Sequence, residues 1–251
     1  MSRAAGWTGW VDLIAPNRWP AYERVLRELN ARQIKFALGG GIATATHSGF
    51  WHETKDLDFY ILPEDRERVI ELTAQLGLAD IHSELPYDHS WTYRSTDGNI
   101  VVEAIWAMRN HRATVDCEWL RRSEEVNAGG LHFRVAAVEE MIWHKLYVVM
   151  KERCDWPDVL NCLYTRAGSL DWSHLLDRLG EDKPLLASAL VLFSWISPDL
   201  VSTVPSWVWN DLGLRISEGG SAADGLRRAA LLSTYNWYGP MADGVTLERS
   251  R

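Results

Sequence analysis

Residues 36–61, which read FALGGGIATATHSGFWHETKDLDFYI, limit the fold more than any other segment of this 251-residue chain. Three glycines end an apolar run, and two aspartates one residue apart precede a second apolar run. We therefore expect a short buried strand over residues 35–41 that ends in the glycine turn, and a second strand over residues 57–63. The small residues at 41–50 favour a helix that begins at the glycines.

The rest of the chain alternates helical and strand patterns in its first half and is mostly helical afterwards. The patterns predict helices over residues 20–34, 64–77, 138–153 and 154–168, a hairpin over 90–108 around Asp97-Gly98, and a strand over 127–137. The apolar run at 184–196 is too short to cross a membrane and favours a buried helix. We expect an α+β fold with a sheet-bearing core over residues 1–135 and a helical domain over 136–251, packed closely together.

Three carboxylates are the candidates for chemistry. Asp56 and Asp58 point to the same side of a strand, and like charges that close repel unless a cation lies between them. Oxygen-only ligands select Mg²⁺ or Mn²⁺, while a glycine turn at a helix N-terminus lets backbone N–H groups approach phosphates. Glu103 lies in an otherwise apolar strand, where an unpaired carboxylate is costly. Together they indicate a nucleoside triphosphate site, although each alone could be a simple turn, a surface bend or an edge-strand glutamate.

Composition narrows the class of protein. The formal net charge of −8 argues against broad nucleic-acid binding, although a local patch would still allow it. Acidic residues interleave the densest basic segment, which we therefore interpret as a solvated face containing Arg109, Arg112, Arg121 and Arg122. The odd cysteine count without a CxxC motif argues against a disulfide framework or a zinc site, and the N-terminus lacks a signal-peptide core. We expect a cytoplasmic protein without a membrane segment.

Several of these residues resemble the signature of a known family, the nucleotidyltransferase superfamily with the DNA polymerase beta-like fold. The signature is a glycine turn, here Gly40 and Gly41, then an Asp-x-Asp at a strand start, here Asp56 and Asp58, and a third acid on a later strand, here Glu103. The segment 39–58 is similar to the branch of bacterial abortive-infection and toxin-type enzymes. The resemblance covers about residues 30–165 and implies a small mixed β-sheet.

The resemblance also implies an activity. It implies Mg²⁺- or Mn²⁺-dependent transfer of a nucleoside monophosphate from an NTP to a hydroxyl-bearing acceptor, which could be a small molecule, a protein or tRNA. It implies that Asp56, Asp58 and Glu103 hold the metal and carry the catalysis, with Glu103 helping to deprotonate the acceptor. The nucleotide-binding residues that it implies are Gly40, Gly41, Thr54, Lys55, Lys145 and Asp158.

Alternatives stay open at several of these positions. Lys145 could equally be a helix lysine whose stem packs on the protein while its head reaches water. Asp155 is best interpreted as a helix N-cap, and Asp158 as a partner of a ribose, a metal or a lysine. The alternative function is a non-catalytic nucleotide-binding or regulatory module on the same fold. The sequence identifies neither the nucleotide, nor the acceptor, nor the oligomeric state.

Overall fold

The structure is a computed structural model that describes residues 7–51, 54, 56–215 and 219–232. Its strands are β1 Phe36–Leu38, β2 Asp56–Ile61, β3 Ala79–Asp80, β4 Thr92–Thr96, β5 Val101–Ile105, β6 Glu124–Ala128 and β7 Leu131–Val135. Its α-helices are α1 Trp19–Ala31, α2 Gly40–Ser48, α3 Arg66–Gln75, α4 Cys117–Arg122, α5 Val138–Leu146, α6 Trp156–Arg166, α7 Trp172–Leu179, α8 Lys183–Ile196, α9 Ser206–Asp211 and α10 Ala222–Leu232.

The strands form one mixed sheet in the order β3-β4-β5-β2-β1-β7-β6. The pairs β2·β5 and β1·β7 are parallel, whereas the other neighbouring strands are antiparallel. The register places Asp58 beside Glu103 and, on the next strand, Arg94 beside the same Glu103. The small mixed sheet expected from the sequence, with the acids on adjacent strands, is therefore present.

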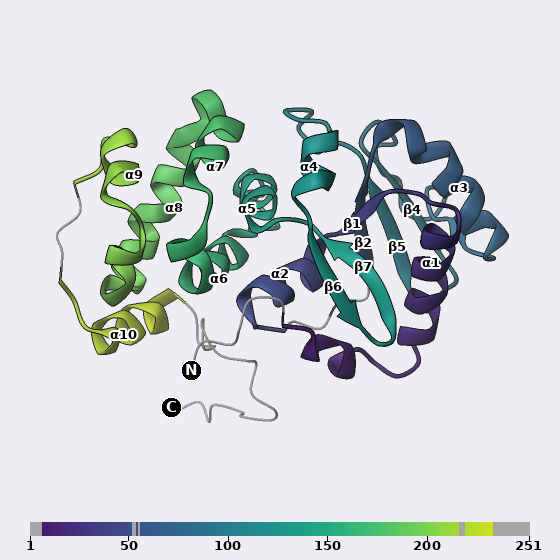
Figure 1. Cartoon of the computed structure of the whole chain (residues 1–251), viewed down its shortest axis with the longest axis horizontal. Helices are drawn as coiled ribbons and strands as arrows, with labels where there is room; N and C mark the ends of the chain where they lie inside the picture. Colours follow the sequence, from purple (N-terminus) through teal and green to yellow (C-terminus); the bar gives the residue numbers. More distant parts are fainter. Residues whose placement is uncertain (1–6, 52–53, 55, 216–218, 233–251) are drawn as a thin grey trace.

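The helices divide into those beside the sheet and those that extend away from it (Figure 1). Helix α1 packs against β7, α3 packs against β4, and α2 packs against β2. Helices α5 and α6 contact α2 and each other, and the chain continues from there into α7, α8, α9 and α10 at the far end of the molecule (Figure 1). Helix α2 thus contacts both the sheet and the helical half.

A single hydrophobic cluster runs through both halves, from Trp10 and Leu57 at the sheet to Leu186 and Trp209 among the last helices. The close packing expected between the halves follows from this shared core. Within the described residues no helix combines the length and apolarity needed to cross a bilayer. The apolar run at 184–196 forms most of α8, whose Leu186, Leu190 and Phe193 are fully buried, as the sequence predicts.

The sequence-based elements differ from the structure in a few places. The helix expected over 138–153 ends at Leu146, because Val149 and Cys154 form a β-bridge that turns the chain back on itself. The single strand expected over 127–137 is instead the end of β6, a turn at Gly129-Gly130 and β7, which form a hairpin. The sequence predicts neither helix α4 nor strand β3. The sequence also predicts a solvated face with Arg109, Arg112, Arg121 and Arg122. Arg109 is exposed, as expected, and it also lines a cavity beside the sheet, whereas the other three bind carboxylates elsewhere.

Candidate active site

The acids predicted from the sequence lie side by side on the sheet. Asp56 and Asp58 come from β2, and Glu103 comes from the parallel neighbour β5, directly beside Asp58. Residues paired across adjacent strands stand on the same face about 5 Å apart along the hydrogen-bonding direction. All three acids therefore line one cavity of about 600 Å³, a volume in the range of small-molecule sites.

Gly40 and Asp58 fit against each other too closely for any residue other than glycine at position 40. Gly40 is the first residue of α2 and adopts a left-handed backbone conformation with φ of +51°. A Cβ atom at this position would lie 1.7 Å from Oδ2 of Asp58. The glycine turn therefore serves to bring the helix N-terminus against the second acid, and this contact explains why a glycine precedes the acids in the sequence.

Burial and charge act together on Asp58. Burial is the largest cause that raises the pKa of Asp58. The negative charges of Glu103 and Asp56 raise the pKa further, to about 7. The repulsion inferred from the sequence is thus present in the folded protein. A cation placed between these carboxylates would remove that repulsion.

Glu103 is buried, and neighbours on β4 satisfy its carboxylate. Thr92 donates its hydroxyl to Oε1 at 3.1 Å, and the guanidinium of Arg94 lies 3.2 Å from Oε2. Burial raises the pKa of Glu103, while the charge of Arg94 and the Thr92 hydrogen bond oppose that shift. Nothing in the sequence singles out Arg94, which is an ordinary strand residue until the register is known.

Lys145 joins α5 to the start of α6. Its Nζ donates to Oδ2 of Asp155 at 2.9 Å and to Oδ2 of Asp158 at 2.7 Å, and its side chain is only 7% exposed. Asp155 occupies the N-cap position of α6, but its carboxylate makes no capping hydrogen bond and binds Lys145 and Arg153 instead. The interpretation of Asp155 as a side-chain cap is therefore wrong, and so is that of Lys145 as a lysine with its head in water.

The opposite wall of the cavity belongs to the helical half. It contains His144, Lys145, Val148, Met150, Arg153 and Asp155. Partial burial and then the charge of Lys145 lower the pKa of His144 to about 4, so its Nδ1 meets the hydroxyl of Tyr60 at 2.7 Å as a neutral ring. The cavity thus places carboxylates on the sheet against lysine and arginine on the helices.

The remaining sequence-predicted residues lie around this centre. Gly41 follows Gly40 in the first turn of α2. Thr54 accepts a hydrogen bond from the backbone N–H of Asp56 at 3.1 Å and so shapes the entry to β2. Asp158 touches the cavity only through Lys145, and Lys55 lies outside the described residues.

A divalent cation fits the oxygen-only donors Asp56 and Asp58, whose mutual repulsion it would relieve. Among the described residues, however, no three or more His, Cys, Asp or Glu side chains are placed to hold one ion. The three-carboxylate metal group expected from the sequence is therefore not formed in this structure. The reason is that the Glu103 carboxylate is engaged by Arg94 and Thr92.

A family model described as "uncharacterised nucleotidyltransferase" matches residues 20–194. That match spans more than half of the chain, and it covers the acids, the glycine turn and the ion pairs of Lys145. The chain belongs to this family, and it is a nucleotidyltransferase. The narrower abortive-infection and toxin-type branch is not confirmed by this match and stays a prediction.

Solved structures with a similar arrangement include antibiotic-resistance factor ANT(2'')-Ia in solution, at 18% identity and a TM-score of 0.48, covering 67% of this chain and 92% of that one. The lincosamide antibiotic adenylyltransferase LnuA, lincomycin-bound, has 12% identity and a TM-score of 0.44, covering 61% and 98%. An antigenic nucleotidyltransferase-like protein from Paracoccidioides brasiliensis has 19% identity and a TM-score of 0.41, covering 84% and 98%. No curated protein matches the chain. The family assignment rests on the family model alone.

Proposed function

We propose that this protein is a Mg²⁺- or Mn²⁺-dependent enzyme that transfers a nucleoside monophosphate from an NTP to a hydroxyl group of an acceptor. The observation that carries the proposal is the position of Asp58, between the glycine-led N-terminus of α2 on one side and Glu103 on the other. A helix N-terminus favours phosphate, and converging carboxylates favour the cation that accompanies it. No other part of the described cavity combines a helix N-terminus with converging carboxylates.

In the proposed reaction the acceptor hydroxyl oxygen forms a bond to the α-phosphorus of the NTP. The bond from that phosphorus to the oxygen bridging to the β-phosphate breaks, so pyrophosphate leaves, and the hydroxyl proton passes to the carboxylate of Glu103. When bound, the divalent cation would polarise the transferring phosphoryl group. Asp56 and Asp58 would hold that cation, and Glu103 would join them as a third ligand by releasing Arg94 or Thr92.

The remaining predicted residues take supporting roles in this proposal. The backbone N–H groups at Gly40 and Gly41 bind phosphate oxygens. Thr54 holds the start of β2 in place beside them. Lys145 faces the phosphates from α5, and Asp158 orients its ammonium group. Lys55 is retained as a nucleotide-binding candidate from the sequence.

The proposal extends to the setting of the enzyme. We place the catalytic core at residues 1–135 and the helical domain at 136–251, with Lys145 and Arg153 as the contribution of the second to the site. The cavity volume of about 600 Å³ favours a small-molecule acceptor over a macromolecule. Free thiols at Cys117, Cys154 and Cys162 suit a reducing, cytoplasmic compartment.

The test separates nucleotide binding from transfer. The protein is incubated with an α-labelled NTP, Mg²⁺ and a cell extract, and label transfer and NTP affinity are measured for the parent, Asp58→Asn and Glu103→Gln. Asp58→Asn should lose Mg²⁺-dependent NTP binding. Glu103→Gln should keep NTP affinity within about a few-fold and lose transfer by roughly 10²-fold or more, the scale on which removal of a proton acceptor acts.

Glu118→Gln serves as the control, because Glu118 binds Arg121 on the surface, away from the cavity. It should transfer label like the parent. Transfer by Glu103→Gln at the parental rate would remove Glu103 from the mechanism, and NTP binding by Asp58→Asn that still responds to Mg²⁺ would move the metal site elsewhere.

A further inference from the structure

The cavity wall on the β4 side presents hydrogen-bond donors, some of which the protein itself does not use. We call Trp91, Arg94 and Arg109 the donor wall; all three line the cavity. Among the described residues, the indole N–H of Trp91 and the Nε–H of Arg94 are buried without a partner. In that same part of the chain Arg109 makes no ion pair with a carboxylate, and its guanidinium touches only the sulfur of Met150. A buried donor without a partner costs about 1–3 kcal/mol, so the Trp91 and Arg94 donors are arranged for something that is bound, and the exposed guanidinium of Arg109 adds positive charge beside them.

The donor wall lies on the side of the acids away from the proposed phosphate cradle. In the sheet order β4-β5-β2-β1, Arg94 is on β4, Glu103 is on β5, and Asp58 on β2 meets the N-terminus of α2 that follows β1. A nucleotide with its phosphates at that N-terminus approaches the acids from the β1 side. The group that attacks the phosphorus then approaches from the β4 side, where the donor wall lies.

The loop that carries Trp91 is fixed in place. The indole N–H of Trp106 donates to the carbonyl oxygen of Ser90 at 2.8 Å, and the hydroxyl of Tyr87 accepts from the backbone N–H of Arg94 at 3.0 Å. These bonds hold the donor wall before a ligand arrives, and preorganised donors lose little freedom on binding.

Apart from Asp56 and Asp58, which the proposed function assigns to the metal, the carboxylates that line the cavity already have partners. Asp88 accepts two hydrogen bonds from Ser90, at 2.6 and 2.9 Å, and lies 3.5 Å from His111. Asp155 binds Lys145 and Arg153. The wall therefore offers positive charge and free donors, which is the chemistry that recognises a carboxylate or a phosphate group.

We propose that the donor wall is the acceptor subsite, and that the acceptor is a small hydroxyl compound that carries a carboxylate or phosphate group. The inference rests on the proposed function and adds the charge of its second substrate. The two guanidinium groups and the indole N–H bind the oxyanion, while the hydroxyl is directed at Glu103, which Arg94 already contacts.

The first experiment identifies the acceptor by its charge. Small molecules from a cell extract are separated into anionic, neutral and cationic pools, and each pool is incubated with the full-length protein, Mg²⁺ and α-labelled NTP; the macromolecular fraction is assayed beside them. Label should pass to compounds of the anionic pool. Label on a compound of the neutral or cationic pool, on protein or on RNA would overturn the inference while leaving nucleotidyl transfer intact. Absence of label everywhere would instead contradict the proposed function.

The second experiment tests the wall itself, using the active pool as the probe. Arg109→Gln and Trp91→Phe should each raise the half-saturating amount of that pool by about ten-fold or more, the effect of losing a hydrogen bond to a charged group. The KM for the NTP should stay within about two-fold, because neither residue meets the nucleotide. Arg112→Gln is the matched control, since Arg112 lies in the same loop but binds Glu181 and Asp182 outside the cavity. If Arg109→Gln behaves like Arg112→Gln, the donor wall is not the acceptor subsite.

Discussion

The absence of a Cβ atom at Gly40 determines where the carboxylate of Asp58 lies. The left-handed backbone of Gly40 would strain any other residue by about 1–2 kcal/mol, and a Cβ atom would meet Oδ2 of Asp58 at 1.7 Å. The collision and the strain have different consequences. Strain lowers stability alone, whereas the collision displaces the carboxylate on which the proposed chemistry depends.

We therefore expect Gly40→Ala to lower both the melting temperature and the rate of nucleotidyl transfer. A displacement of about 1 Å at a reacting group can cost roughly 10²-fold in rate, which is the loss expected here. Gly130→Ala is the control, because Gly130 has φ of +73° but no atom within 4 Å of a built Cβ. It should lose about 1 kcal/mol of stability at unchanged activity. Equal activity in both variants would mean that Asp58 tolerates the displacement.

At the scale of the elements, Lys145 of α5 forms ion pairs at the start of α6, and the burial of these pairs makes them important for stability. The side chains of Lys145 and Asp155 are 7% and 10% exposed, and Asp158 supplies the second carboxylate. Burial alone would lower the pKa of Lys145, but the charges of Asp158 and Asp155 raise it. Removing one partner leaves buried charge uncompensated, and such losses reach about 3–5 kcal/mol.

This predicts that Lys145→Met destabilises the protein, in addition to any effect on transfer. A double-mutant cycle with Asp158→Asn, followed by urea denaturation, should give a coupling energy of about 1–3 kcal/mol. The pair Lys183 and Asp211, at 2.9 Å but 37% and 41% exposed, should couple by less than about 1 kcal/mol. Equal coupling energies for the two pairs would mean that burial does not strengthen the Lys145 ion pair, and that Lys145 stabilises the protein only through the packing of its aliphatic chain.

The elements that the sequence predicts are those with strong local signals. The acids, the glycine turn and the hairpin around Asp97-Gly98 depend on neighbours in the chain, and the structure contains all of them. Strand β3 has only two residues, both exposed, and β6 contains only two buried residues, so periodicity does not distinguish them from loops. Helix α5 ends before the expected residue because Val149, which the helical pattern includes, pairs with Cys154 in a β-bridge. Local sequence periodicity does not reveal this pairing.

Register explains why the sequence missed Arg94. A two-residue turn at Asp97-Gly98 would place Arg94 opposite Val101. The connection actually spans residues 97–100, with the Asp97 carboxylate accepting from the N–H groups of Asn99 and Ile100, and Arg94 therefore faces Glu103. Arg109 was missed for a related reason, because a loop arginine has no period from which its cavity position could be deduced.

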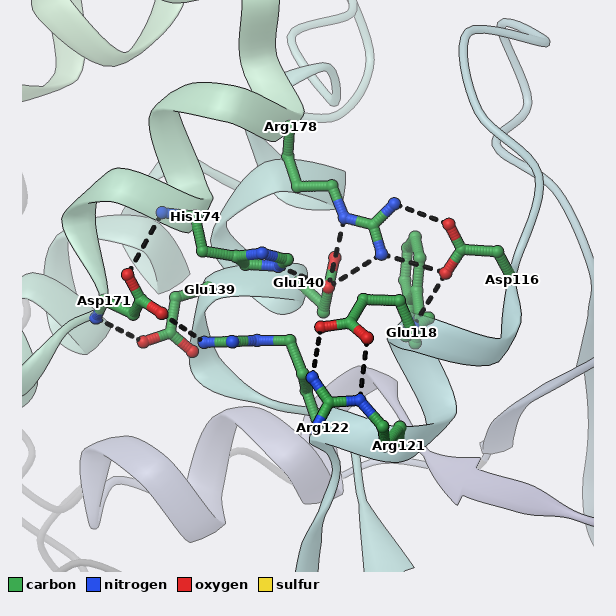
Figure 2. A network of polar contacts seen from close by, with 10 residues as sticks. Asp116, Glu118, Arg121, Arg122, Glu139, Glu140, Asp171, His174 and Arg178 are labelled. Atoms are coloured by element: carbon green, nitrogen blue, oxygen red, sulfur yellow. Dashed lines mark hydrogen bonds and ion pairs between the residues drawn. The ribbon is translucent and has the colours of Figure 1, made fainter.

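For the molecule as a whole, a polar network ties the sheet-bearing half to the helices (Figure 2). Arg178 of α7 binds Asp116, at the N-cap of α4, at 2.6 and 2.9 Å, and lies 3.2 Å from Glu140 of α5. Glu140 is fully buried and also meets His174 at 2.8 Å, while the guanidinium of Arg178 lies over the ring of Trp143. One arginine thus neutralises a buried charge and bridges the two halves.

Because the halves also share one hydrophobic cluster, we expect them to unfold together and Arg178 to stabilise both. Arg178→Met should lower the free energy of unfolding by about 3 kcal/mol, since it leaves Glu140 with His174 alone. Amide hydrogen exchange, followed by mass spectrometry, should accelerate by a similar factor in β2 and in α8.

Arg121→Met is the control, because Arg121 in the same network binds the surface carboxylate of Glu118, and it should change stability by less than about 1 kcal/mol. Faster exchange confined to α7 and α8, with β2 unchanged, would show that the two halves unfold independently and that the network does not couple the catalytic acids to the helical domain.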